Sequence, residues 1–215
     1  MPTREIPCKN ESNSILLVEG IDDCHVIMSL CAAHNVPETF GLYECGGDDQ
    51  LLRRLNALII QPEAPKIIGI VLDADTGVDD RWTSVRAKLR HYDYRFPEVP
   101  EIYGTIIEAE APLPKLGVWL MPNNQGAGML EDFCIEMIEA TAREAAETCV
   151  HGAQGKGVST FLPTHFSKAV VHTYLAWQDE PGRPLGQAIT TQALRPHTET
   201  ARAFTDWLTL LFNIA

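Results

Sequence analysis

Hydrophobic positions in the first half of the chain follow two alternating patterns. Short apolar or alternating runs are typical of strands, and longer stretches with apolar residues every three to four positions are typical of helices. The strand-like runs and the helical patterns that follow them are 14–18 then 22–35, 40–45 then 50–60, and 67–72 then 79–92. Strands and helices that alternate at this spacing predict parallel strands joined by right-handed crossovers. We therefore expect an α/β fold.

The pattern changes after Pro97. Two β-like runs, 102–109 and 116–121, are joined by a loop that contains prolines, and we expect both as strands at the sheet edge, paired as a hairpin. A loop at 123–128 then precedes residues 129–149, whose Ala, Glu and Ile content predicts one long helix.

The rest of the chain is predicted to be helical. A glycine-rich stretch at 152–157 has the composition of a flexible linker, and it lacks the spacing of a phosphate-binding loop. The helical patterns after it are 164–178, 184–194 and 199–213. We expect this tail to pack onto the sheet through Trp177, Trp207, Leu208, Leu211 and Phe212.

These elements predict a mostly parallel sheet flanked by helices, with a C-terminal helical extension. The expected division is an N-terminal tail at 1–13, an α/β domain at 14–150 and a helical extension at 151–215. A chain of 215 residues, 45% of them hydrophobic, is long enough for a core of this kind.

Charge narrows the classes of partner. The formal net charge is −12, which argues against broad electrostatic adhesion to nucleic acid or to an anionic membrane. A specific contact with phosphate through a metal ion stays open. The chain has no signal-peptide pattern and no stretch near the ~20 apolar residues of a membrane span, so we expect a cytoplasmic protein without membrane attachment.

Three acidic residues stand directly after predicted strands. Glu19 follows the first strand, and Asp73 and Asp75 follow the third. Ligands of open parallel sheets bind beyond the carboxyl ends of the strands, where the strand order reverses. If the first and third strands are neighbours, the three carboxylates converge, and the usual reason for such a cluster is a hard divalent cation such as Mg²⁺.

The motifs around these residues resemble the Toprim family, the catalytic domain shared by topoisomerases, primases, ribosomal-RNA maturases and overcoming-lysogenisation-defect nucleases. The first Toprim motif is a hydrophobic strand that ends in Glu-Gly, matched by Ile15-Leu-Leu-Val-Glu19-Gly20. The second is a hydrophobic strand that ends in Asp-x-Asp, matched by Ile70-Val-Leu-Asp73-Ala-Asp75. The resemblance covers roughly residues 14–135.

Two further motifs resemble a small uncharacterised branch of Toprim-like proteins. They are Gly117-Val-Trp119-Leu-Met-Pro122-Asn123 and Gly128-Met-Leu-Glu131-Asp132-Phe133, and they extend the similarity towards residue 178. The chain departs from many Toprim nucleases at Ile21, where those proteins carry a lysine after Glu-Gly.

The resemblance implies a role for each acidic residue. Glu19 is the acid/base or metal carboxylate, and Asp73 and Asp75 are ligands of Mg²⁺ or Mn²⁺. Glu131 or Asp132 supplies a further acidic position, and a second ion would complete a two-metal arrangement for phosphodiester cleavage. These five residues are the expected metal ligands.

Basic residues add a second group of candidates. Lys168 lies on a predicted helix and, if it approaches the carboxylates, it could neutralise charge in a phosphoryl-transfer transition state. The alternative is a solvated helix position. Six more basic residues on two helices form a track only if they share a face: Arg53, Arg54, Arg81, Arg86, Lys88 and Arg90.

Three functions remain open from the sequence. The first is an Mg²⁺-dependent phosphoryl-transfer enzyme on nucleic acid, most simply a nuclease with Glu19, Asp73, Asp75 and Lys168 as catalytic residues. The second is a binding or regulatory module that keeps the fold without turnover. The third is a haloacid-dehalogenase-like phosphatase with Asp73 as nucleophile. Some Toprim nucleases work beside an ATPase subunit, so the resemblance also implies nucleic acid and a separate ATPase as partners.

Overall fold

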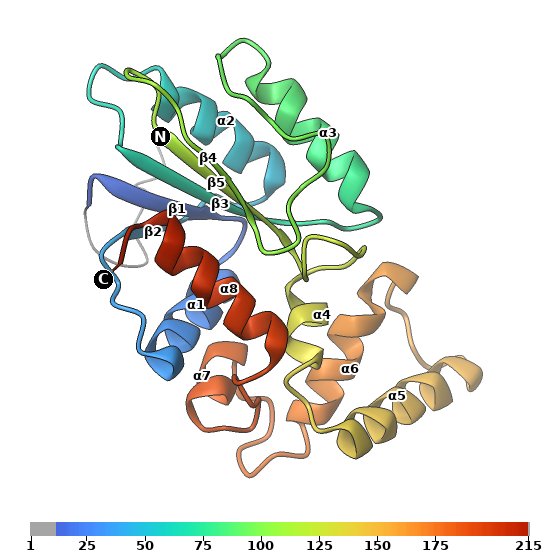
Figure 1. The fold of residues 1–215 in the computed structure, drawn as a ribbon. Coiled ribbons are helices and arrows are strands. Elements are labelled where there is room, and N and C mark those ends of the chain that lie inside the picture. The colour runs from blue at the N-terminus through green and yellow to red at the C-terminus, as the bar shows by residue number, and fades with distance from the viewer. Residues whose placement is uncertain (1–11, 215) are drawn as a thin grey trace, which may run out of the picture.

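The computed structural model describes residues 12–214, and its centre is a five-stranded sheet in the order β2-β1-β3-β5-β4 (Figure 1). Strands β2, β1, β3 and β5 run parallel, and β4 runs antiparallel to β5. This confirms the predicted α/β class. Most of the predicted N-terminal tail, residues 1–13, lies outside the described residues. The strands are β1 Ser14–Val18, β2 Gly41–Glu44, β3 Ile67–Asp73, β4 Thr105–Ile107 and β5 Lys115–Met121.

Helices cover both faces of the sheet. Helices α2 and α3 lie on one face, and α1 and α8 lie on the other (Figure 1). Within residues 12–214, no helix has both the length and the apolar character needed to cross a membrane. The helices are α1 Ile21–His34, α2 Asp48–Ile59, α3 Val78–Leu89, α4 Leu130–Ile135, α5 Ala140–Gly155, α6 Phe166–Leu175, α7 Leu185–Thr190 and α8 Glu199–Leu211, with a 3₁₀ turn at Pro163–His165.

Alternation along the strands divides the core into two layers. On β3, Ile68 and Ile70 pack with α2 and α3, whereas Val71 packs with the helices of the opposite face. Successive side chains of a strand point to opposite faces, so a strand buried on both sides is apolar throughout. This explains why β3 is the most strand-like run of the sequence.

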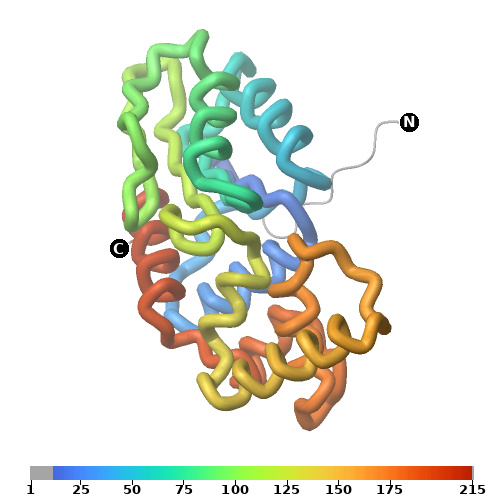
Figure 2. The backbone as a smooth tube through the Cα atoms, turned by 90° about the vertical axis from the view of Figure 1, so that its right-hand side faces the viewer, coloured from blue at the N-terminus to red at the C-terminus, as the bar shows by residue number. Residues whose placement is uncertain are grey.

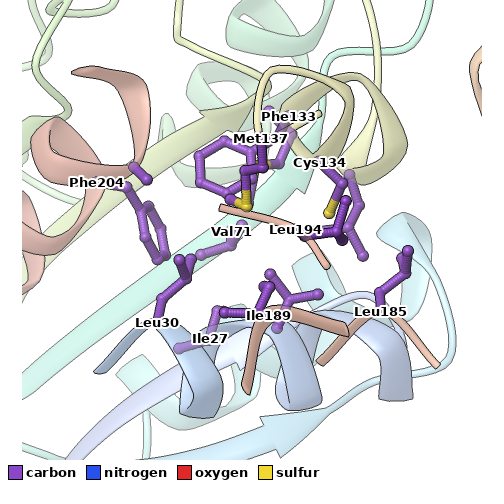
Figure 3. Packing of buried hydrophobic residues seen from close by; sticks show 14 of the residues in the cluster. Ile27, Leu30, Val71, Phe133, Cys134, Met137, Leu185, Ile189, Leu194 and Phe204 are labelled. Carbon is purple, nitrogen blue, oxygen red and sulfur yellow. The ribbon is translucent and has the colours of Figure 1, made fainter. Parts of the chain in front are cut away.

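The C-terminal helices belong to the same core as the sheet. Ile189 of α7 lies beside Ile27 of α1, and Phe204 of α8 lies near Val71 of β3 (Figure 3). Leu185 of α7 belongs to the same cluster. Helix α5 continues across residue 150, where the expected α/β domain ends and the helical extension begins. Helix α6 packs beside α5 and against α4 (Figure 2). The tail therefore packs on the α/β layer through a shared hydrophobic cluster.

Two glycines let α8 approach the sheet closely. Gly69 and Gly117 are register partners on β3 and β5. A Cβ built on Gly117 would lie 2.3 Å from Leu211 Cδ2, and one built on Gly69 would lie 2.9 Å from the same atom. The absence of side chains at these two glycines therefore leaves the space that the Leu211 side chain fills.

The predicted pair of strands after Pro97 is correct as a hairpin and wrong in two details. Strand β5 is an interior strand, because it pairs with β3 on one side and β4 on the other. Only β4 lies at the edge, and it is limited to Thr105–Ile107. Because β5 is an interior strand, both of its faces are buried, and this explains why its sequence is a continuous apolar run.

The single helix predicted at 129–149 is wrong. Helix α4 ends at Ile135, and α5 starts anew at Ala140 with the Glu139 carboxylate as its N-cap, accepting from the backbone N–H groups of Thr141 and Ala142. Met137 is buried in the break between the helices. Burial in the core thus outweighs the helix propensity of this stretch.

Two smaller predictions about the tail are also corrected. Most of the predicted glycine-rich linker is helical, because α5 continues to Gly155. Trp177 is 48% exposed, so it does not help to pack the tail onto the sheet. Trp207, Leu208, Leu211 and Phe212 are buried as predicted.

Candidate metal centre

The predicted carboxylates lie at the point where the sheet reverses its strand order. Helix α1 connects β1 to β2 on one face of the sheet. Helix α2 connects β2 to β3 on the opposite face, and α3, which follows β3, lies on that same face. Strands β1 and β3 are neighbours, so the reversal falls between them. This is the place where open α/β sheets bind ligands. Glu19 follows β1, and Asp73 ends β3.

Glu19 and Asp73 are in direct contact. Glu19 Oε1 accepts a hydrogen bond of 2.7 Å from the backbone N–H of Asp73. Asp73 Oδ1 in turn accepts one of 2.9 Å from the backbone N–H of Leu130, at the start of α4. These two bonds join the ends of β1 and β3 to the first turn of α4, which is where Glu131 lies.

Asp75 is held by its backbone and by an ion pair. Its N–H and carbonyl form hydrogen bonds of 2.8 and 2.9 Å with the backbone of Gly128, which joins the β3 end to the loop before α4. Its φ of 50° lies in the left-handed region, which aspartate tolerates better than most residues. Its side-chain Oδ2 accepts a hydrogen bond from Arg81 Nη2.

Asp23 is a further member of the cluster, which the motifs of the sequence did not identify. Its side chain caps the start of α1, because Asp23 Oδ2 accepts a hydrogen bond of 2.9 Å from the backbone N–H of Gly20. The side chain is also buried, and burial raises its pKa to about 7, with the charge of Glu19 acting in the same direction. The available signal was its place in the first turn of the helix that directly follows Glu19-Gly20, which keeps it close to the end of β1.

The buried carboxylates raise one another's pKa. Burial raises the pKa of Asp73 to about 9, and the charges of Asp23, Glu19, Glu131 and Asp75 contribute further. Burial also raises the pKa of Glu19, while the hydrogen bond from Asp73 and the charge of Arg81 act against the shift. The positive charges near the cluster are thus too few to offset its negative charges when all of its carboxyl groups are ionised.

Lys168 reaches this cluster from α6. Its Nζ lies 3.0 Å from Oε1 of Glu131, whose side chain is only 7% exposed, while the lysine side chain is 51% exposed. The hydrogen bond to Glu131 is the main reason that the pKa of Lys168 is raised, and the charges of Asp22 and Asp73 add to it. Lys168 therefore lies beside the carboxylates and is more than a solvated helix residue.

Asp132 is engaged in a different way from Glu131. Its Oδ2 accepts a hydrogen bond of 2.8 Å from the backbone N–H of Met129 and so caps the first turn of α4. Its Oδ1 accepts a hydrogen bond from Ser167 Oγ of α6. Its carboxylate thus joins α4 to α6, whereas Glu131 is the acid of this turn that acts electrostatically on Asp73.

Arg81 and Asp48 are further side chains beside the site. Arg81 Nη1 donates to Asp48 Oδ2, and the contact with Arg81 lowers the pKa of Asp48. From the sequence, Arg81 is one of six basic residues that form a track only if they share a face. Arg53 forms an ion pair with Asp49, and Arg86 donates to the carbonyl of Glu98, so Arg81 is set apart by its contacts with two carboxylates of the site.

The donor set suits a divalent cation, but its geometry is not that of an assembled site. Glu19, Asp73 and Asp75 supply carboxylate oxygens, the ligands that Mg²⁺ and Mn²⁺ favour, and burial disfavours their ionised form in the absence of a counter-charge. In the part of the chain that the structure describes, no three acidic, histidine or cysteine side chains are already grouped as metal ligands. Arg81 already pairs with Asp75 and therefore competes with an ion for that carboxylate.

The fold and the cluster together define an α/β protein with acidic side chains at the switch point of its sheet. A family model described as a protein of unknown function (DUF3226) matches residues 13–213, and the chain belongs to this family. The match covers both the sheet and the C-terminal helices. Neither a curated protein nor a solved structure matches the chain.

Proposed function

We propose that this protein is a divalent-cation-dependent enzyme that cleaves phosphodiester bonds in nucleic acid, a nuclease of the Toprim type. The observation that carries the proposal is the contact between Glu19 and Asp73 across the two central strands. The Toprim resemblance rests on two motifs that are more than 50 residues apart, and the fold brings their acidic residues into contact at the switch point.

Each acidic residue has a role in this proposal. Glu19, Asp73 and Asp75 would hold Mg²⁺ or Mn²⁺, and Glu131 and Asp23, whose charges act on Asp73, would be the carboxylates for a second ion. Such ions polarise a phosphoryl oxygen and lower the pKa of bound water. Asp132 would be the weaker candidate ligand, because both of its oxygens already accept hydrogen bonds, from Met129 and from Ser167.

Two residues would handle protons and charge. Burial raises the pKa of Glu19, which moves its carboxyl group towards the range where it can exchange a proton at neutral pH. Lys168 is half exposed and paired with Glu131, so its ammonium group can face a substrate phosphate at the rim of the site.

The charge of the protein limits the kind of substrate contact. A net charge of −12 disfavours extended binding along a duplex, so affinity must come from a few contacts near the ions. A separate ATPase partner remains part of the proposal through the resemblance to Toprim nucleases.

A binding module without turnover is the second candidate. The ion pair between Asp75 and Arg81 favours it, because one proposed metal ligand is already neutralised by a guanidinium. The phosphatase alternative stays a prediction. Capture of an aspartyl-phosphate analogue by Asp73 would support it.

The deciding experiment is a cleavage assay on single-stranded and duplex DNA and RNA with Mg²⁺ or Mn²⁺. We expect cleavage by the wild type that needs the ion and falls at least ~100-fold in Glu19→Gln and Asp73→Asn, because each removes a carboxylate from the reacting site. Glu44→Gln is the matched control, because Glu44 is an exposed acid at the end of β2. Metal binding without cleavage of any of the four substrates would favour the binding module.

A further inference from the structure

We propose that Arg81 is the phosphate-binding residue of this site, and that a cation which takes Asp75 releases Arg81 to the substrate. This inference rests on the proposed function and adds a substrate-binding group to it. It also sets an order of binding, with the ion first and the phosphate second.

The position of Arg81 suits this role. It lies in the first turn of α3, where its N–H donates to the carbonyl of Gly77 at 3.2 Å. Its guanidinium bridges Asp48, at the start of α2, and Asp75, after β3. Strand β1 lies between β2 and β3, so this bridge passes beside the end of the strand that carries Glu19. The charge of Arg81 indeed acts on Glu19.

The chemistry of the guanidinium also suits phosphate. Its two described side-chain bonds use one N–H on each terminal nitrogen, out of five N–H donors in the group. The planar fork of an arginine matches two oxygens of a phosphate, and the arginine stays protonated at any physiological pH.

Arg81 supplies a charge that the first motif lacks. Ile21 follows Glu19-Gly20 and is 47% exposed, so no cation comes from that position. Lys168 is the cation on the α6 side and is paired with Glu131. Arg81 approaches from the α3 side, and its side chain is only 11% exposed, so its fork is already placed by the packing around it.

Asp75 couples the two ligands. Its Oδ2 accepts the bond from Arg81, and an ion bound to the same carboxylate would neutralise the negative charge that holds the guanidinium and so weaken that bond. Without the ion, Arg81 is neutralised by two carboxylates and attracts phosphate weakly. With the ion on Asp75, only Asp48 remains as its acidic partner, and the freed N–H groups can bind phosphate.

This coupling predicts opposite effects of one substitution. In Arg81→Gln, the affinity for Mn²⁺ measured by calorimetry should rise about 3- to 10-fold, because the competitor for Asp75 is gone. Affinity for phosphorothioate oligonucleotides, measured with Mn²⁺ present, should fall at least ~10-fold, because a charge-assisted hydrogen bond contributes at least that much. The probes are single-stranded and duplex DNA and RNA.

The controls separate this role from a structural one. Arg81→Lys keeps the charge and should restore part of the oligonucleotide affinity. Arg86→Gln removes an exposed arginine of the same helix and should change neither affinity. Thermal unfolding of each variant checks that the fold is kept, and Arg81→Lys provides the test if Arg81→Gln does not fold.

The failures are distinguishable. Wild-type protein that binds Mn²⁺ but none of the oligonucleotides, or unchanged oligonucleotide affinity in Arg81→Gln, overturns the role of Arg81 and leaves the metal site standing. Mn²⁺ affinity that stays the same or falls in Arg81→Gln contradicts the coupling through Asp75. Wild-type protein that binds no Mn²⁺ overturns the proposed function itself.

Discussion

Glu19 accepts a hydrogen bond of 2.7 Å from the backbone N–H of Asp73, although the two residues are 54 positions apart in the chain. The bond forms because β1 and β3 are adjacent parallel strands that end at the same edge of the sheet. It brings together the acidic residues of both motifs and places them at the switch point. The proposed metal chemistry depends on this relationship.

Stability of the metal-free protein should fall as the pH rises. The pKa of Asp23 is about 7 and that of Asp73 about 9 in the folded protein, against an ordinary value of 3.8. Between pH 4 and these values the folded chain keeps protons that the unfolded chain has released, so the free energy of unfolding decreases with rising pH. We expect the Tm in EDTA to be lower at pH 8 than at pH 5.

Asp73→Asn tests the source of this pH dependence. Asparagine keeps the acceptor for the N–H of Leu130 and is neutral without taking up a proton on folding, so the Tm at pH 8 should rise and the slope with pH should flatten. Asp93→Asn, at an exposed loop position, makes the same change in net charge and should have little effect. A lower Tm of Asp73→Asn at pH 8 would contradict this interpretation.

Loss of the Lys168 ammonium should destabilise the protein through Glu131. In Lys168→Met the carboxylate of Glu131, only 7% exposed, loses its cation. Because the lysine is half exposed, we expect a loss of about 1–2 kcal/mol, below that of a fully buried pair. Chemical denaturation measures this change.

A second substitution checks the origin of that loss. Glu131→Gln in the Lys168→Met background removes the unpaired charge and should recover part of the stability. Lys156→Met, at an exposed position after α5, should be close to neutral. Equal effects of the two lysine substitutions would show that the Glu131 pair contributes nothing.

Gly117→Ala should disrupt the contact between α8 and the sheet. Its Cβ would lie 2.3 Å from Leu211 Cδ2, so the Leu211 side chain or α8 itself must shift, at a cost of about 1–3 kcal/mol in the free energy of unfolding. Gly152→Ala in α5 meets no atom within 4 Å and should stabilise by up to about 1 kcal/mol through helix propensity. Denaturant midpoints compare the two variants. A neutral effect of Gly117→Ala would contradict the close packing of Leu211 against Gly117.

The βα units and the carboxylates at their ends were predictable from the sequence because they depend on local pattern. A buried parallel strand is a continuous apolar run, and a polar residue directly after it must lie at the carboxyl edge of the sheet. Asp73 and Asp75 follow such a run, as Glu19 does. The neighbouring placement of β1 and β3 was an assumption that the structure bears out.

The features missed from the sequence depend on contacts between distant segments. The break before α5 comes from the burial of Met137 and the cap by Glu139, in a stretch whose composition favours a continuous helix. The bridge from Arg81 to Asp48 joins residues 33 positions apart on different helices. Helical periodicity alone places an arginine on a face but does not identify its partner.

Calorimetric titration of Mg²⁺ and Mn²⁺ into the wild type and into the Asp73→Asn, Asp75→Asn double variant tests the central claim most directly. We expect saturable binding of the ion to the wild type and its loss in the double variant, with the fold of the variant retained by circular dichroism. Binding that survives both substitutions would place the ion elsewhere. Wild-type protein that binds neither ion would contradict a metal centre built on Glu19, Asp73 and Asp75.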